Sequence, residues 1–146
     1  MHWYIIEFRK EGVEVRLATS HYALNCNGMT THRTSPIVYA PNKYLDGIYN
    51  TKYFYVYLGD IDYSNYVRKY TDDLLVPTAE RALVDYIRFE KIQDEGTLLW
   101  AMQDYLDSSN CDIDKLYEVS DFYKVPREEI DYWITEAKTE PYYSMG

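Results

Sequence analysis

The sequence predicts an α+β fold, in which an antiparallel or mixed β-sheet with one short helix precedes a bundle of about four helices. Up to Val76, apolar residues alternate or form short runs between turn residues, which is typical of strands. From Pro77 onward they recur at intervals of three and four, which is typical of amphipathic helices. We expect one domain over residues 1–138, mainly β over 1–76 and mainly α over 77–138, and a flexible tail over 139–146.

The first elements are predicted to be a hairpin and a short helix. Residues 3–8 and 13–17 carry strand patterns on either side of the turn at Glu11-Gly12, so we expect them to pair. Residues 20–26 (SHYALNC) are expected to form the short helix. This helix is predicted to end near Asn27-Gly28, because both residues tolerate a left-handed backbone.

Further strands are predicted from apolar runs that proline or turn residues delimit. They cover residues 37–40, 52–58 and 74–76. The run at 52–58 (KYFYVYL) is apolar on both faces, which is typical of a strand covered on both sides. Nine tyrosines fall between Tyr39 and Tyr70, and we expect most of them to pack on the sheet, with any exposed members suited to an interface.

The second half predicts four helices with defined starts. Thr78 is a good N-cap for the first helix, because its hydroxyl can accept from a free backbone amide. The negative charge of Glu80 is favourable near the positive, N-terminal end of the helix dipole. Asp112 is predicted to cap the third helix, and Pro126 to stand in the first turn of the fourth. The predicted buried faces, helix by helix, are Ala79, Leu83, Tyr86 and Ile87; Leu98, Leu99, Met102 and Leu106; Ile113, Leu116, Val119 and Tyr123; and Ile130, Trp133, Ile134 and Ala137.

The net charge of −9 is concentrated in the C-terminal third. Residues 94–146 carry thirteen acids against four Lys and Arg, whereas residues 1–93 carry eleven of each. Such a field repels nucleic acid and attracts basic surfaces, so we expect no direct nucleic-acid binding. The predicted partner-binding acids are Asp104, Asp107, Asp112, Asp114, Glu118 and Asp121. The alternative is that they form an ordinary solvated surface.

Two features mimic functional motifs without their chemistry. The helices joined at residues 124–126 resemble a helix-turn-helix in spacing, but the second helix is acidic where a recognition helix needs Arg or Lys. His21, Cys26 and His32 resemble a zinc site, but zinc normally takes four ligands at tight, paired spacings. We therefore expect a helical hairpin and no zinc.

Asp60 and Asp62 follow the predicted strand at 52–58 and raise the hypothesis of a magnesium site for nucleotidyl transfer. The Gly-Ser turn and third carboxylate that would complete it are not evident, so a solvated turn is favoured. No glycine-rich phosphate loop, nucleophile elbow or His-Glu-x-x-His motif is present. The sequence predicts no catalytic residue, metal or cofactor.

The sequence also predicts a cytoplasmic protein without a membrane segment. Cys26 and Cys111 match no metal or redox spacing, which fits two free thiols in a reducing compartment. The N-terminal apolar run lacks the basic lead and cleavage site of a signal peptide. No apolar run approaches membrane-spanning length.

Residues 76–89 (VPTAERALVDYIRF) resemble a motif of the C-terminal domain of AbiEi-type antitoxins, from bacterial type IV toxin–antitoxin and abortive-infection systems. The motif is Thr/Ser-x-Glu-Arg/Lys-Ala/Thr-Leu-hydrophobic-Asp. The matching residues are Thr78, Glu80, Arg81, Leu83 and Asp85. Residues 20–43 are similar to the short helix, Gly-hydrophobic-Thr turn and strand that precede it in the family. The resemblance implies a structural role for the motif, with Arg81 and Asp85 paired on the helix surface.

Members of that family typically carry an N-terminal winged helix that binds their own promoter. The matching region begins near Ser20, so we expect neither the winged helix nor autoregulation. The resemblance then implies a non-enzymatic antitoxin that neutralises a nucleotidyltransferase-like toxin, in a bacterium or its phage. The alternative is an anti-defence inhibitor of the anti-CRISPR kind, whose acidic C-terminal helices block a nucleic-acid-binding surface of a protein partner. A nucleotidyl transferase using Asp60 and Asp62 is the third hypothesis.

Overall fold

Within the part of the chain that the structure describes, six strands and five helices follow one another in the order that the α+β prediction requires. The computed structural model describes residues 16–30, 37–40, 48–50, 55–58, 61–70, 74–90 and 94–141. The elements are β1 (Arg16–Ala18), α2 (Ser20–Cys26), β2 (Ile37–Ala40), β3 (Ile48–Asn50), β4 (Tyr55–Leu58), β5 (Val67–Lys69), β6 (Leu74–Pro77), α3 (Ala79–Phe89), α4 (Glu95–Asp107), α5 (Ile113–Phe122) and α6 (Arg127–Thr139). The predicted fold class is confirmed.

The sheet is mixed, with the order β3-β4-β2-β1-β6-β5. β1 runs parallel to β6, with Arg16 opposite Leu74, and antiparallel to β2, with Leu17 opposite Tyr39. β2 and β4 are also parallel, while β3 and β5 form antiparallel edges. The strand predicted at 37–40 is confirmed, and the one at 74–76 extends to Pro77.

Some strand predictions lie partly outside the described residues. The strand predicted at 52–58 is present as β4 from Tyr55 onward, while 52–54 lie outside. Of the predicted hairpin, residues 3–8 and 13–15 also lie outside. Its last residues belong to β1, whose neighbours in the sheet are β2 and β6, so the predicted pairing with 3–8 is wrong for these residues. β3 and β5 were not predicted, because each has only three residues and therefore too little alternation to recognise.

The short helix and its end are confirmed. α2 spans the predicted residues 20–26. Gly28 follows with a φ of +74°, a left-handed conformation that glycine adopts without a Cβ clash. The backbone amide of Met29 then donates to the carbonyl of Leu24 at 3.0 Å, which closes the helix.

The predicted helix caps are also present. The Thr78 hydroxyl accepts from the Arg81 amide at 3.3 Å, and Asp112 accepts from the Lys115 amide at 3.0 Å. Asp94 caps α4 by accepting from the Thr97 amide at 3.0 Å. Pro126 directly precedes α6. Each capping side chain satisfies an amide that the first helical turn leaves unbonded.

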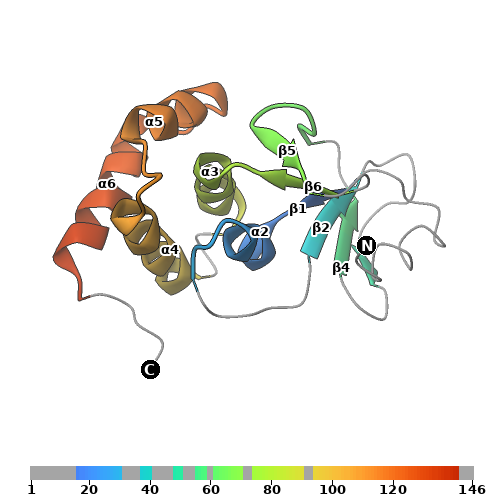
Figure 1. Cartoon of the computed structure of the whole chain (residues 1–146), viewed down its shortest axis with the longest axis horizontal. Helices are drawn as coiled ribbons and strands as arrows, with labels where there is room; N and C mark the ends of the chain where they lie inside the picture. The colour runs from blue at the N-terminus through green and yellow to red at the C-terminus, as the bar shows by residue number, and fades with distance from the viewer. Residues whose placement is uncertain are drawn as a thin grey trace.

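α3 is the central helix of the molecule. Figure 1 shows the strands on the right, α4, α5 and α6 on the left, and α2 with α3 between them. α3 packs against α2, β6, α4 and α5. All residues from 80 to 87 are buried, charged ones included. The core therefore surrounds α3 rather than lying under one face of it.

The C-terminal end of α6 is held against α4. Gln103 is 5% exposed, and its Nε2 donates to the carbonyls of Ala137, Glu140 and Pro141 at 3.3, 3.4 and 3.1 Å. The first residues of the predicted tail are thus bonded to the domain, and residues 142–146 lie outside the described structure. Among the helices described, none combines the length and apolarity needed to cross a bilayer.

Candidate functional site

Arg81, a residue of the motif, is buried at the centre of a polar network. Its side chain is 1% exposed. Nε donates to Asp85 Oδ2 at 3.1 Å, Nη1 to the Asn65 carbonyl at 2.8 Å, and Nη2 to the Asp62 carbonyl at 2.6 Å. The predicted pairing of Arg81 with Asp85 is confirmed, but its predicted place on the helix surface is wrong, because the turn at 61–66 folds over that side of α3. Arg81 fastens this turn to the helix, and Asp85 holds the Arg81 side chain.

A second network joins α3 to α4 and α5 through Glu80. The Tyr105 hydroxyl donates to Glu80 Oε2 at 2.7 Å and accepts from the Asp112 backbone amide at 2.9 Å. Burial raises the pKa of Tyr105, and the Glu80 carboxylate raises it further, so the hydroxyl remains a donor. Leu83 is fully buried in the core. All five motif residues therefore have structural contacts that account for them.

The Asp62 carboxylate is occupied by its own turn. Oδ1 accepts from the amides of Ser64 and Asn65 at 2.8 and 3.2 Å. Oδ2 accepts from Asn65 Nδ2 at 2.9 Å and from the Tyr123 hydroxyl at 2.8 Å. Partial burial opposes ionisation, but these hydrogen bonds outweigh it and lower the pKa of Asp62 to about 2. Both oxygens are thus taken, which favours the predicted turn over the magnesium hypothesis; Asp60 lies outside the described residues.

The Asp62 turn predicts a pH dependence of folding. A carboxyl whose folded pKa is depressed stabilises the fold above its unfolded pKa, and this stabilisation disappears as pH falls through the folded value. We expect Asp62→Asn to lower the free energy of unfolding by about 1 kcal/mol at pH 7, since solvent screens this turn. The deficit relative to the unmodified protein should shrink between about pH 4 and pH 2. Urea unfolding of both proteins across this pH range tests the prediction. A difference in unfolding free energy that does not change with pH would contradict it.

Of the three candidate zinc ligands, His21 makes other side-chain contacts. His21 Nε2 is 2.9 Å from Thr97 Oγ1 and 3.5 Å from Asp94 Oδ2. Cys26 and Cys111 are free thiols, and burial raises the pKa of both, which makes them weak nucleophiles. His32 lies outside the described residues. Within the described ranges, no three His, Cys, Asp or Glu side chains gather as a metal site.

Four of the six predicted partner-binding acids have intramolecular partners. Asp104 accepts from the Thr30 amide at 2.7 Å, and Asp112 caps α5. Glu118 accepts from the Tyr66 hydroxyl at 3.0 Å, and Asp121 pairs with Arg127 at 2.8 Å. Asp107 and Asp114 are exposed, and neither has an ion pair in the described part of the chain. The predicted docking face is therefore largely engaged within the domain.

An exposed aromatic–arginine patch lies where α3, α5 and the 61–66 turn meet. We define it as Tyr66, Arg88, Phe89, Phe122 and Tyr123. The Arg88 guanidinium lies 4.5 Å from the ring centre of Phe89 and 4.6 Å from that of Tyr123. The Phe122 ring is 5.0 Å from Tyr123 and 5.4 Å from Tyr66, in edge-to-face contacts. Phe89 is 41% exposed and Phe122 is 49% exposed.

Sequence reasoning missed this patch. Phe89 and Phe122 are the last residues of α3 and α5, and neither belongs to the apolar stripe that identified its helix. An aromatic residue at the end of a helix and outside its apolar stripe would have indicated an exposed ring, and this signal was present in the sequence. Only Tyr66 was indicated in part, because it belongs to the tyrosines at 39–70, of which any exposed members were expected to suit an interface.

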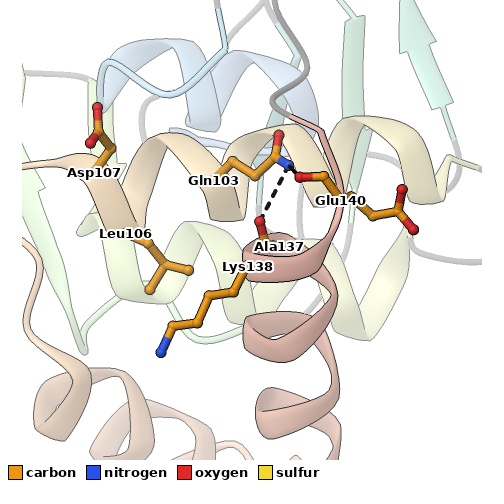
Figure 2. A pocket seen from close by; sticks show the side chains of 6 residues that line it. All are labelled: Gln103, Leu106, Asp107, Ala137, Lys138 and Glu140. Carbon is orange, nitrogen blue, oxygen red and sulfur yellow. Dashed lines mark hydrogen bonds between the residues drawn. The ribbon is translucent and has the colours of Figure 1, made fainter.

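A cavity of about 430 Å³ lies between the C-terminal halves of α4 and α6. Gln103, Leu106, Asp107, Ala137, Lys138 and Glu140 line it. Figure 2 shows the Asp107 carboxylate and the Lys138 ammonium pointing away from each other, with Gln103 directed at the helix end. Because its charged groups do not converge, the cavity offers no arrangement for catalysis.

Comparison with known proteins adds no relative: no protein-family model matches the chain, and no curated protein matches it.

Proposed function

We propose that this chain is a non-enzymatic cytoplasmic protein that acts by binding a protein partner, with the aromatic–arginine patch at the centre of the contact. The exposed rings of Phe89 and Phe122, which Arg88 and Tyr123 connect, carry this proposal. The partner class is the one that the AbiEi resemblance implies, a nucleotidyltransferase-like toxin, which the chain would neutralise as an antitoxin. The motif helix α3 supports this arrangement because its last two residues, Arg88 and Phe89, belong to the patch.

The patch has the composition of an interface centre. Aromatic and Arg side chains dominate binding energy where they become fully desolvated, and adjoining exposed apolar rings mark interaction surfaces. Arg88 is already held by Asp85 Oδ1 at 2.9 Å and by two rings. A side chain ordered in advance loses less conformational freedom when it binds. The patch is therefore suited to recognising an apolar surface with a carboxylate nearby.

Removing both exposed rings should abolish partner capture. We expect the double variant Phe89→Ala/Phe122→Ala to bind the partner at least about tenfold more weakly, because each truncated ring is of the hot-spot type. The measurement is a tagged pull-down from the native host at low and high salt, with captured proteins identified and quantified by mass spectrometry. Recovery of a nucleotidyltransferase-like protein by the unmodified chain would support the antitoxin role.

Tyr132→Ala is the matched control, because Tyr132 is 53% exposed on α6, outside the patch. It should retain full capture. Equal capture by the unmodified chain, the double variant and the control would refute the patch as the contact surface.

The alternative is an anti-defence inhibitor that blocks a nucleic-acid-binding surface with its acidic helices. It is favoured by exposed acids without ion pairs in the part of the chain described, namely Asp107, Asp114 and Glu128. Under this hypothesis the captured complex is basic and handles nucleic acid, and capture is lost at high salt. Asp107→Asn/Asp114→Asn would then weaken capture, whereas the patch variant would not.

A further inference from the structure

A second cavity, of about 340 Å³, lies on another part of the molecule. Segments far apart in the sequence form its walls: the end of α2, strand β5, the start of α3 and the end of α4 with the loop after it. The lining residues are Cys26, Asn27, Gly28, Met29, Arg68, Ala79, Asp104, Tyr105, Ser108 and Asn110. Its volume is at the lower end of the range typical of small-molecule sites.

Hydrogen bonds between the elements fix these walls in place. Asn27 Nδ2 donates to the carbonyls of Ala23 and Pro77, both at 2.9 Å, which ties the end of α2 to β6. The Thr30 amide donates to Asp104 Oδ2 at 2.7 Å, which ties the same segment to α4. Met29 and Tyr105, which also line the cavity, are 3% and 2% exposed and belong to the packed core. The cavity is therefore formed before any ligand arrives.

Opposite charges line the cavity without neutralising each other. Arg68 donates one weak hydrogen bond, from Nη2 to the Cys26 carbonyl at 3.4 Å. Asp104 accepts through Oδ2, and no cation among the described residues lies within ion-pair distance of it. Partial burial raises the pKa of Asp104, the Thr30 amide opposes this shift, and neighbouring Asp107 adds to it.

We propose that this cavity binds a small zwitterion of amino-acid size, with its carboxylate on Arg68 and its ammonium on Asp104. The guanidinium presents a planar set of donors that matches a carboxylate. Asp104 Oδ1 accepts from the ammonium. Both protein charges then gain a partner. Arg68 is exposed, whereas Asp104 is half-buried, where such a contact is stronger than in water. A ligand with only one charge leaves either Arg68 or Asp104 without a partner of opposite charge.

The test is isothermal titration calorimetry, together with thermal unfolding, on the full chain. The probes are the α-amino acids and the ω-amino acids from β-alanine to 6-aminohexanoate, which vary the separation of the two charges. Butyrate and butylamine, at equal ionic strength, supply each charge alone. We expect saturable binding of at least one zwitterion and a rise of about 2 °C or more in the unfolding midpoint at saturation.

Arg68→Gln and Asp104→Asn should each weaken that binding at least about tenfold, as expected when a charge-assisted hydrogen bond is lost. The amide oxygen that Asp104→Asn introduces can still accept from the Thr30 amide, so this variant should keep the fold. Lys69→Gln and Asp114→Asn remove the same charges from residues that do not line the cavity, and should leave binding unchanged.

Three results would overturn the proposal: no saturable heat with any zwitterion, equally tight binding of butyrate or butylamine, or full affinity in both cavity variants.

Discussion

Arg81→Met should lower the free energy of unfolding by about 3–5 kcal/mol, the cost typical of breaking a buried ion pair by removing one partner. Arg81 is 1% exposed and supplies donors to Asp85 and to the carbonyls of Asp62 and Asn65. Met fills most of the space but donates no hydrogen bond. The Asp85 carboxylate and two carbonyls would then lose their main donor at once.

Urea unfolding followed by circular dichroism measures this loss. Arg88→Met is the matched control, since Arg88 bonds the other oxygen of the same carboxylate from a side chain that is 28% exposed. We expect the control to lose about 1 kcal/mol or less. A loss of similar size in both variants would mean that Arg81 contributes only as a surface charge.

Tyr105→Phe should lower the free energy of unfolding by about 2–3 kcal/mol. The hydroxyl donates to the Glu80 carboxylate at 2.7 Å and accepts from the Asp112 amide at 2.9 Å, and the Asp112 carbonyl also lies 2.9 Å from it. Glu80 is only 9% exposed, so water does not readily replace the lost donor. The Asp112 residue also caps α5, and loosening it weakens the start of that helix.

A double-mutant cycle with Glu80→Gln separates the two contributions. We expect a coupling free energy of about 1 kcal/mol between Tyr105 and Glu80, the remainder belonging to the Asp112 amide. Tyr117→Phe is the control, because the Tyr117 hydroxyl also donates to a carboxylate, that of Asp131, but at the surface. It should change stability by no more than about 0.5 kcal/mol. Equal losses at both positions would contradict the importance of burial.

The helical half was predictable because its signals are local. Thr78 and Asp112 cap helices through bonds to residues three positions on, and Pro126 marks a start through its own backbone geometry. The short helix at 20–26 was predicted with its end at Gly28 for the same reason. Such contacts need no knowledge of the tertiary structure.

The missed features all depend on contacts between distant segments. The turn at 61–66 buries Arg81, and nothing within α3 itself indicates this. The neighbours of β3 and β5 define them as edges, because three residues carry no period. The patch and the charged cavity each assemble from three or more elements, so composition alone predicted neither. The acidic residues were visible in the sequence, but their intramolecular partners were not.

The position of β1 in the sheet has a consequence for synthesis of the chain. β1 lies between β2 and β6, and its parallel partner, Leu74 opposite Arg16, is far downstream. Until β6 has left the ribosome, one side of β1 has none of its final partners, and an unpaired strand edge invites addition of a strand from another molecule. We therefore expect nascent chains halted before Leu74 to need a chaperone more than chains that already include β6, which covers this edge of β1.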